Sequence, residues 1–203
     1  HFSGYGMGWS LNDYNGKKVI SHGGGSDGMI SKVAMIPEEN FGVVVLTNNI
    51  NYLSNALTNQ IFDMYFGNPD KDWSKLYLER YSAGNKQAKE EREKFATDRI
   101  QNTKPSFELS AYEGTYHSEA YGNVKVSKGA GEKLVFEFEP AADLISDLTH
   151  YHFDIFSIKM RNNPALPEGT VQFIQDTKGK IMELKLDIPN PDFFFDEYKF
   201  IKL

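Results

Sequence analysis

The stretch that decides the fold covers residues 19–48 and reads VISHGGGSDGMISKVAMIPEENFGVVVLTN. Two apolar runs, at 29–36 and 41–48, flank the turn sequence PEEN. The second run contains four consecutive apolar residues at 43–46, a pattern typical of a strand that is covered on both faces. The stretch therefore predicts neighbouring antiparallel strands joined by a short turn.

The segments on either side extend this sheet. Toward the N-terminus, apolar sequence at 5–11 and 18–20 flanks the pair Asn15-Gly16, which is a strong signal for a hairpin turn. Toward the C-terminus, apolar side chains follow at helical spacing, so we expect a helix that packs on the sheet. Its apolar face consists of Leu53, Ala56, Leu57, Ile61, Met64 and Tyr65. Residues 1–67 are thus predicted to form four antiparallel strands and one closing helix.

The rest of the chain divides into two further regions. Residues 68–106 combine aromatic and leucine side chains at helical spacing with a mixed-charge stretch, which predicts a linker of one or two amphipathic helices. The charges could form a partner surface, but a solvated helix face stabilised by i,i+4 pairs is the favoured interpretation. In residues 107–203, apolar and polar residues alternate between repeated turn signals, so we expect seven or eight short strands in a small barrel or sandwich.

The composition excludes several classes of protein. The 203 residues carry a formal net charge of −6 and no long basic run, so we expect no nucleic-acid partner. No apolar stretch approaches the roughly 18 residues that a membrane-spanning helix needs, and no membrane span is predicted. The chain contains no cysteine, which excludes disulfides and thiolate metal sites but does not identify the compartment.

A histidine followed by three glycines, His22 and Gly23–Gly25, marks the first candidate site. Glycine weakens a strand, so three in a row are expected where a side chain would block something. One possibility is a substrate along the strand edge, with a backbone N–H directed at a developing oxyanion. The other is a bulge or loose turn with an incidental histidine. The chain contains no S-x-x-K, and Ser21 points away from His22 on a strand, so no Ser–Lys or Ser–His pair is identified.

A second candidate site is the sequence THYHFD at 149–154. If this segment is one strand, His150, His152 and Asp154 share a face, and two imidazoles with a carboxylate could bind zinc or a similar metal. The favoured alternative is that these polar groups face water or neighbouring strands while the residues between them face the core. No metal and no cofactor are therefore predicted.

The first region resembles the C-terminal stretch of the class C beta-lactamase and penicillin-binding-protein superfamily, which are serine hydrolases of the beta-lactamase/transpeptidase fold. The resemblance lies in YGMGWSL at 5–11 and in ISHGGGSDGMISKVAMIPEENFGVVVLTNN at 20–49. The last region is similar to the lipocalin-like domain often appended to such proteins. That similarity lies in YEGTY at 112–116, LTHYHFDIF at 148–156 and DTKGKIMELKLDI at 176–188.

The resemblance implies an α+β fold with three parts. These are a partial beta-lactamase/transpeptidase-like antiparallel sheet with its closing helix in 1–67, a helical linker in 68–106 and an all-β lipocalin-like barrel in 107–203. It also implies three sequence motifs: S-x-x-K, Y-x-N or a variant, and K-T-G or H-x-G. S-x-x-K is absent, whereas the third motif is present as His22-Gly23-Gly24. The chain is therefore expected to be a C-terminal fragment of a longer hydrolase, inactive alone because the nucleophile is absent.

The roles of single residues follow from matching the H-x-G motif. His22 occupies the position of the family's lysine and is implied to orient or polarise the substrate. Gly24 completes the motif, and Gly25 is implied to supply one oxyanion N–H. These three residues form the implied partial catalytic site, with Gly23 and Ser26 as substrate-binding positions. In the parent protein, the implied reaction is hydrolysis of a peptide, amide, lactam or ester bond through an acyl-enzyme.

The resemblance also implies partners and a location. The missing N-terminal part of the catalytic domain should cover the sheet, so the chain is expected to expose a sheet face and to self-associate. A small-molecule or peptide substrate of the parent is implied, as is the periplasmic or extracellular side of a bacterial cell. The alternative to the hydrolase is a non-catalytic module. A ligand-binding barrel would contain an open aromatic-lined cavity, whereas a scaffold barrel would be filled.

Overall fold

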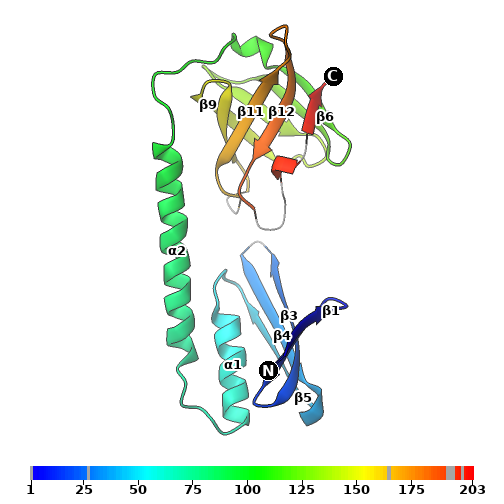
Figure 1. Ribbon diagram of the computed structural model, residues 1–203, viewed down its shortest axis with the longest axis vertical. Helices are drawn as coiled ribbons and strands as arrows, with labels where there is room; N and C mark the ends of the chain where they lie inside the picture. Colours follow the sequence, from blue (N-terminus) through cyan, green and yellow to red (C-terminus); the bar gives the residue numbers. More distant parts are fainter. Residues whose placement is uncertain (1, 27, 164–165, 191–194, 198) are drawn as a thin grey trace. The chain divides into compact units, whose positions relative to one another are not determined.

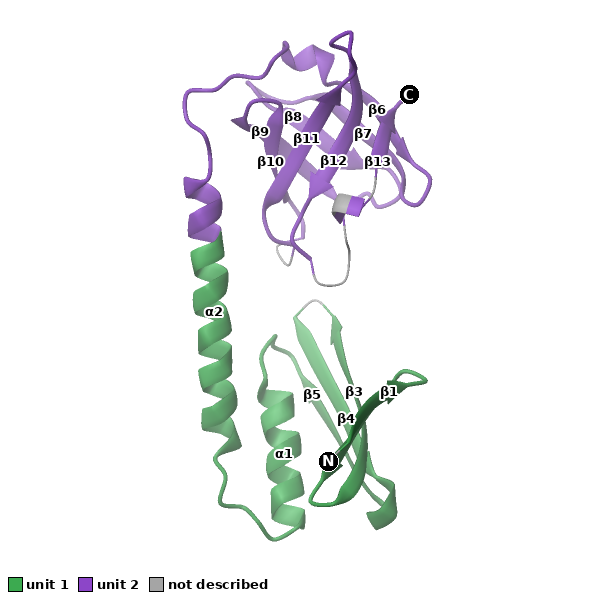
Figure 2. Ribbon diagram, in the orientation of Figure 1, with its two compact units in different colours: residues 1–91 green, residues 92–203 purple. Residues whose placement is uncertain are grey.

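A computed structural model gives the structure of the chain as two compact units, residues 1–91 and residues 92–203 (Figure 2). It describes every residue except 1, 27, 164, 165, 191–194 and 198. Asp27, two positions after the third glycine in the sequence, therefore lies outside the described residues. Each unit has a core of its own and is described by itself.

Unit 1 is built on a five-stranded antiparallel sheet in which neighbours along the chain are neighbours in the sheet (Figure 1). The strands are β1 (Ser3–Gly6), β2 (Trp9–Tyr14), β3 (Lys17–Ser26), β4 (Met29–Ile36) and β5 (Phe41–Thr47), with the short 3-10 helix η1 (Pro37–Glu39) before β5. The hairpin predicted at Asn15-Gly16 joins β2 to β3, and both residues have the positive φ that such a turn requires, 50° and 75°.

The prediction of one strand over 5–11 is wrong. Met7 and Gly8 have φ of 52° and 79°, so the chain reverses there and Gly6 pairs with Trp9. Two consecutive residues in the left-handed region form a tight turn that suits the twist of a hairpin. The segment thus contributes two strands, and the sheet has five strands where four were predicted.

One face of this sheet is covered and the other is open. Helix α1 (Leu53–Tyr65) packs on β4 and β5, and its Phe62 is buried with Ala34 and Ile36. On the opposite face, Val44 and Leu46 are 65% and 76% exposed. The prediction that 43–46 is covered on both faces is therefore wrong within this chain, because α1 supplies a layer on one side alone.

The linker region contains a single long helix, α2 (Trp73–Thr97), in which no described residue is buried. Its first turn is tied to the rest of unit 1 through Asp63, whose carboxylate accepts hydrogen bonds from the Tyr14 hydroxyl and from Trp73 Nε1, the latter at 2.5 Å. None of the helices in the described part of the chain is both long and apolar enough to span a membrane.

Unit 2 is a closed barrel of eight antiparallel strands, as predicted for a small barrel, in which the last strand pairs with the first (Figure 1). The strands are β6 (Gly114–Ser118), β7 (Gly122–Lys128), β8 (Leu134–Phe138), β9 (Ile145–His152), β10 (Ile155–Met160), β11 (Gly169–Gln175), β12 (Ile181–Asp187) and β13 (Lys199–Lys202). Two short 3-10 helices, η2 (Leu109–Ala111) and η3 (Phe195–Glu197), precede β6 and β13. Inward-facing aromatic and aliphatic side chains from all eight strands form the core.

Candidate functional site

The three glycines form a regular part of strand β3. Gly23, Gly24 and Gly25 pair with Lys32, Ser31 and Ile30 of β4, and the register does not shift along this ladder. The interpretation of this segment as a bulge or loose turn is therefore wrong. The ladder with β2 ends at the pair Ser21 and Ser10. Among the described residues, β3 has no strand partner on its β2 side beyond that point, so its glycine-rich half is an open edge.

Contacts with neighbouring residues explain the glycine at two of the three positions but not at the third. A Cβ at Gly24 would lie 2.8 Å from Ser31 Oγ, and a Cβ at Gly25 would lie 3.3 Å from the Ile30 side chain. A Cβ at Gly23 would meet nothing closer than 3.7 Å, so its neighbours do not require glycine there. All three glycines are exposed. Their shared effect is to keep the open edge of β3 free of side chains, which lets another group approach the backbone closely.

His22 lies on the open face of the sheet. It pairs across the strands with Val33, which in turn pairs with the exposed Val44, so these three residues share one face. The imidazole packs edge-on against the Trp9 ring, with 6.2 Å between the ring centroids. Gly24 and Ser26 share the face of His22 because side chains alternate along a strand. The side chain of His22 is exposed and reachable from solvent.

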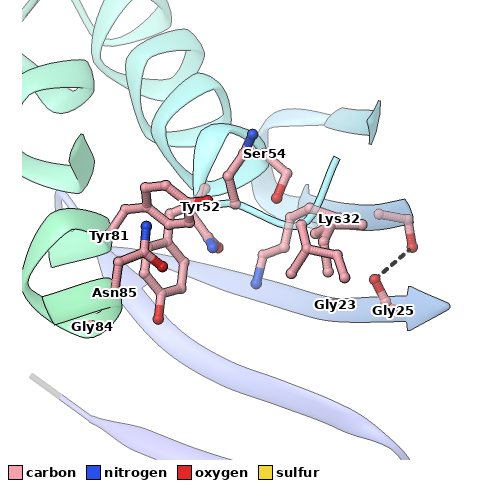
Figure 3. Close-up of a pocket in the computed structure, with 14 residues that line it drawn as sticks. Gly23, Gly25, Lys32, Tyr52, Ser54, Tyr81, Gly84 and Asn85 are labelled. Atoms are coloured by element: carbon pink, nitrogen blue, oxygen red, sulfur yellow. Dashed lines mark hydrogen bonds between the residues drawn. The ribbon is translucent and has the colours of Figure 1, made fainter. Parts of the chain in front are cut away.

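A pocket of about 580 Å³ lies on the other side of β3, between the sheet and the two helices (Figure 3). Its walls include the glycines and Lys32 from the sheet, Tyr52 and Ser54 near the start of α1, and Tyr81 and Asn85 from α2. The Lys32 side chain extends into this space (Figure 3), and burial lowers the pKa of its amine. The Ser54 hydroxyl is buried and has no hydrogen-bond partner among the described residues.

The structure thus separates the sequence-predicted residues into two groups. Gly23, Gly24 and Gly25 all line the pocket, whereas His22 and Ser26 do not and lie on the open face. Sequence reasoning missed Lys32, although a signal was present. By alternation this lysine shares a strand face with buried Ala34 and Ile36, so its inward position follows from the spacing in MISKVAMI. No sequence signal identified the α2 wall of the pocket.

The expectation that 149–154 is a single strand is wrong. Phe153 has φ of 47°, and the chain turns at residues 153 and 154 between β9 and β10. His150 Nε2 lies 3.0 Å from the Phe153 carbonyl oxygen, and His152 Nδ1 accepts a hydrogen bond from the Ile100 N–H at 3.3 Å. Within the described residues, no group of three His, Cys, Asp or Glu side chains is placed to hold a metal ion.

Asp154 instead joins the segment before the barrel to the strands. Its carboxylate accepts hydrogen bonds from the Ser106 N–H and hydroxyl, both at 2.8 Å, from Gln175 Nε2 at 2.9 Å, and from the Tyr112 hydroxyl. Burial alone would raise the pKa of this carboxyl, but the hydrogen bonds together lower it. Burial, followed by the hydrogen bond to the same carboxylate, raises the pKa of the Tyr112 phenol well above its usual range. This arrangement is structural.

Comparisons with known proteins place these features in a context. Residues 98–202 match the family profile described as "Domain of unknown function (DUF3471)". Unguisins hydrolase ungD' of Aspergillus campestris is 30% identical over 131 residues, which are 61% of this chain and 24% of the relative. Unguisins hydrolase ungD of Aspergillus violaceofuscus is 28% identical over 137 residues, which are 63% of this chain and 24% of the relative. The chain therefore spans about a quarter of the length of these curated relatives.

Solved structures were matched as well. The C-terminal domain of a penicillin binding protein aligns with 26% identity and a TM-score of 0.39, over 50% of this chain and 91% of that chain. An octameric penicillin-binding-protein homologue from Pyrococcus abyssi aligns with 21% identity and a TM-score of 0.33, over 98% of this chain and 37% of that chain.

The chain is a C-terminal part of the kind found in beta-lactamase-like and penicillin-binding-protein-like proteins. The curated proteins related to it are named as hydrolases. The chain belongs to the DUF3471 family, whose domain occupies the barrel unit and the segment that leads into it. The two curated relatives are fungal, so they lend no support to the bacterial origin that the resemblance implied.

Proposed function

We propose that this chain supplies one wall of the active site of a beta-lactamase-related serine hydrolase whose nucleophile lies in a part of the protein outside these residues. The observation that carries the proposal is the open, glycine-lined edge of β3 with His22 at its start. The naming of both curated relatives as hydrolases of unguisins supports the reaction class. Their substrate is not transferred to this chain.

The proposed chemistry is acyl transfer to a serine followed by hydrolysis. The serine attacks the carbonyl carbon of a peptide, amide, lactam or ester, and the carbonyl oxygen acquires negative charge. The Gly25 backbone N–H donates one hydrogen bond to that oxyanion, and the imidazole of His22 polarises or orients the substrate. Gly24 holds the motif in its extended form, and Gly23 and Ser26 contact the bound substrate. Water then cleaves the acyl-enzyme.

The open face of the sheet is the second element of the proposal. Its exposed apolar side chains include Met29, Val44 and Leu46, which are 54%, 65% and 76% exposed. Apolar surface of this kind marks a site for another protein layer. We assign this layer to the remainder of the catalytic domain, which brings the nucleophile to the face that carries His22. Without that remainder, two copies of the chain associate through the same face.

The proposal includes two further expectations, one about the architecture of the barrel and one about the cellular location. The barrel of unit 2 is assigned a lipocalin-like architecture, on the basis of its sequence resemblance and its eight closed antiparallel strands. The location on the periplasmic or extracellular side of a bacterial cell rests on the resemblance alone. Fractionation of the source cells, with an antibody to this chain, tests the location directly. Recovery in the cytosolic fraction contradicts it.

The hydrolase proposal is tested in the full-length protein. The substrates are a chromogenic lactam, a nitrophenyl ester and D-amino-acid nitroanilides, and the variants are His22→Ala and Lys18→Ala. Lys18 is exposed on the same strand and the same face, so it serves as the matched control. Loss of a group that stabilises the transition state lowers kcat about 10²-fold or more. We expect that loss for His22→Ala on whichever substrate is turned over, and none for Lys18→Ala.

Two outcomes contradict the proposal. One is equal activity of the two variants with unchanged thermal stability, which removes His22 from the site. The other is saturable ester hydrolysis by residues 1–203 alone, because this sequence contains no S-x-x-K and is expected to be inactive.

A further inference from the structure

The two ends of the barrel in unit 2 are built differently. At the end where β9 turns into β10, aromatic rings fill the interior. Tyr112 contacts Phe156 and Phe173 edge-on, with ring centroids 5.3 Å and 4.9 Å apart, and Phe156 contacts Phe173 at 5.5 Å. These three side chains are 2% exposed or less. This end is therefore closed and packed, as a scaffold barrel would be.

The opposite end contains a cavity of about 320 Å³. Its lining includes described residues from four connections, those between β6 and β7, β8 and β9, β10 and β11, and β12 and β13. Side chains of the strands form its floor, among them Phe136, Met160, Leu186 and Phe200. All four are at most 7% exposed, so these walls are held by the barrel core.

The size of this cavity exceeds what a packing defect explains. Interiors are close-packed, and an apolar cavity of about 150 Å³ already holds a benzene molecule. At about 320 Å³, the cavity accommodates two linked or fused rings and falls at the lower end of the range for ligand sites. Mouths of β-barrels are among the usual places for such sites.

The lining also limits the chemistry of an occupant. None of the described residues that line the cavity is charged, so a neutral molecule fits and an ion does not. One polar atom, Asn163 Oδ1, is buried and has no hydrogen-bond partner among the described residues. A carboxamide oxygen is an acceptor that needs a donor. Ordered water is a poor occupant, because it requires two to four polar partners and the described lining is almost entirely apolar.

From these observations we propose that this cavity binds a small neutral ligand of two-ring size, mainly apolar, that donates one hydrogen bond to Asn163 Oδ1. An aromatic amine, an anilide or a phenol belongs to this chemical class. The site is independent of the proposed hydrolase, because it needs neither the missing nucleophile nor His22. Failure of one proposal therefore leaves the other unaffected.

The test uses a pair of probes that differ in one group. Diphenylamine has two linked rings and a single N–H, and its binding is followed by isothermal titration calorimetry. Diphenyl ether has nearly the same shape and an ether oxygen in place of the N–H. We expect saturable binding of the amine to residues 1–203, and about tenfold weaker competition by the ether, the amount that one hydrogen bond contributes. Asn163→Leu should abolish this preference while both probes still bind.

Two further variants locate the site. Leu144→Trp enlarges a side chain that lines the cavity and should weaken binding at least tenfold. Ile201→Trp introduces the same residue at a position on β13 that is 44% exposed and should leave binding unchanged. Circular dichroism verifies that both variants fold. Leu46→Lys controls for probe bound to the apolar face of unit 1.

The proposal is overturned by any of three results. These are no saturable binding of the amine, unchanged binding in a folded Leu144→Trp variant, and loss of binding in Leu46→Lys. Equal affinity of the two probes in the unsubstituted chain overturns the assignment of Asn163 as the acceptor.

Discussion

Removal of the Asp63 carboxylate should destabilise unit 1 selectively. Asp63 is 7% exposed and lies in α1, where one oxygen accepts from the Tyr14 hydroxyl of β2 and the other accepts from Trp73 Nε1 of α2 at 2.5 Å. One side chain thereby connects a strand and both helices. Burial, together with the hydrogen bond and charge of Asp63, raises the pKa of the Tyr14 phenol well above its usual range.

The magnitude follows from the number of bonds. A hydrogen bond to a charged acceptor contributes about 1.5–3 kcal/mol, so two give about 3–6 kcal/mol. Tyr14 and Trp73 are only partly buried, so both donors regain some hydration in the variant. We therefore expect Asp63→Ala to lower the free energy of unfolding of unit 1 by about 3 kcal/mol. Asp63→Asn keeps one acceptor oxygen and should lose about half as much.

The assay is urea unfolding followed by tryptophan fluorescence. The chain contains two tryptophans, Trp9 and Trp73, and both lie in unit 1, so the signal reports this unit alone. Far-UV circular dichroism follows the barrel in the same samples. Asp70→Ala is the matched control, because Asp70 is exposed and such substitutions change stability by about 0.5 kcal/mol or less. The reasoning is refuted if Asp63→Ala and Asp70→Ala unfold at the same urea concentration.

Three further predictions concern the barrel, the open sheet face and a turn. Hydrogen bonds lower the folded-state pKa of Asp154 despite its burial, so the stability that this carboxylate contributes is present above about pH 4 and is lost as the pH falls through the folded value. Asp154→Asn should therefore flatten the acid unfolding curve of the barrel, and a curve parallel to the wild-type one argues against this prediction. Leu46→Lys should lower the sedimentation coefficient at high protein concentration, unless the open face is not the site of self-association. Gly16 has φ of 75°, so Gly16→Ala should cost unit 1 about 1 kcal/mol in urea, whereas Gly4→Ala, with open space around its Cβ, should cost less.

Local chemistry explains which turns were predicted from sequence and which were not. Asn15-Gly16 was predicted because asparagine and glycine both adopt positive φ readily. Met7 and Phe153 also have positive φ, 52° and 47°, although neither residue type favours it. Their conformations are imposed by the strands on either side, and strand pairing is not encoded at the turn itself. The prediction of one continuous strand over 149–154 was wrong for this reason.

Alternation predicted the inner face of most strands but failed at a bulge. Alternation along the sequence places Met182, Leu184 and Leu186 on one face of β12. Leu184 and Leu186 do point into the barrel, whereas Met182 is 37% exposed and its neighbour Ile181 is buried. The ladder with β11 shifts register at this point, since Ile174 pairs with Glu183 and Gln175 pairs with Ile181. An extra residue on one strand reverses the faces beyond it. Sequence periodicity carries no information about such an insertion.

The sequence predicted the strand that carries the candidate site but not the surroundings of that strand. One face of the sheet is covered by α1, and the other face is open in this chain. The row formed by His22, Val33 and Val44 lies on the open face, and the next row, Gly24, Ser31 and Leu46, lies on it as well. A run of four apolar residues in β5 is expected only where both faces are covered, and α1 covers one. The apolar pattern of β5 therefore predicts a second protein layer on the open face, and that layer would lie directly over His22. We infer that the segment that completes the fold of unit 1 also completes the proposed active site. Substitutions at Val44 that add charge should then impair assembly and catalysis together in the full-length protein, whereas His22→Ala should impair catalysis alone. A full-length Val44→Asp variant that assembles normally and retains activity would falsify this inference.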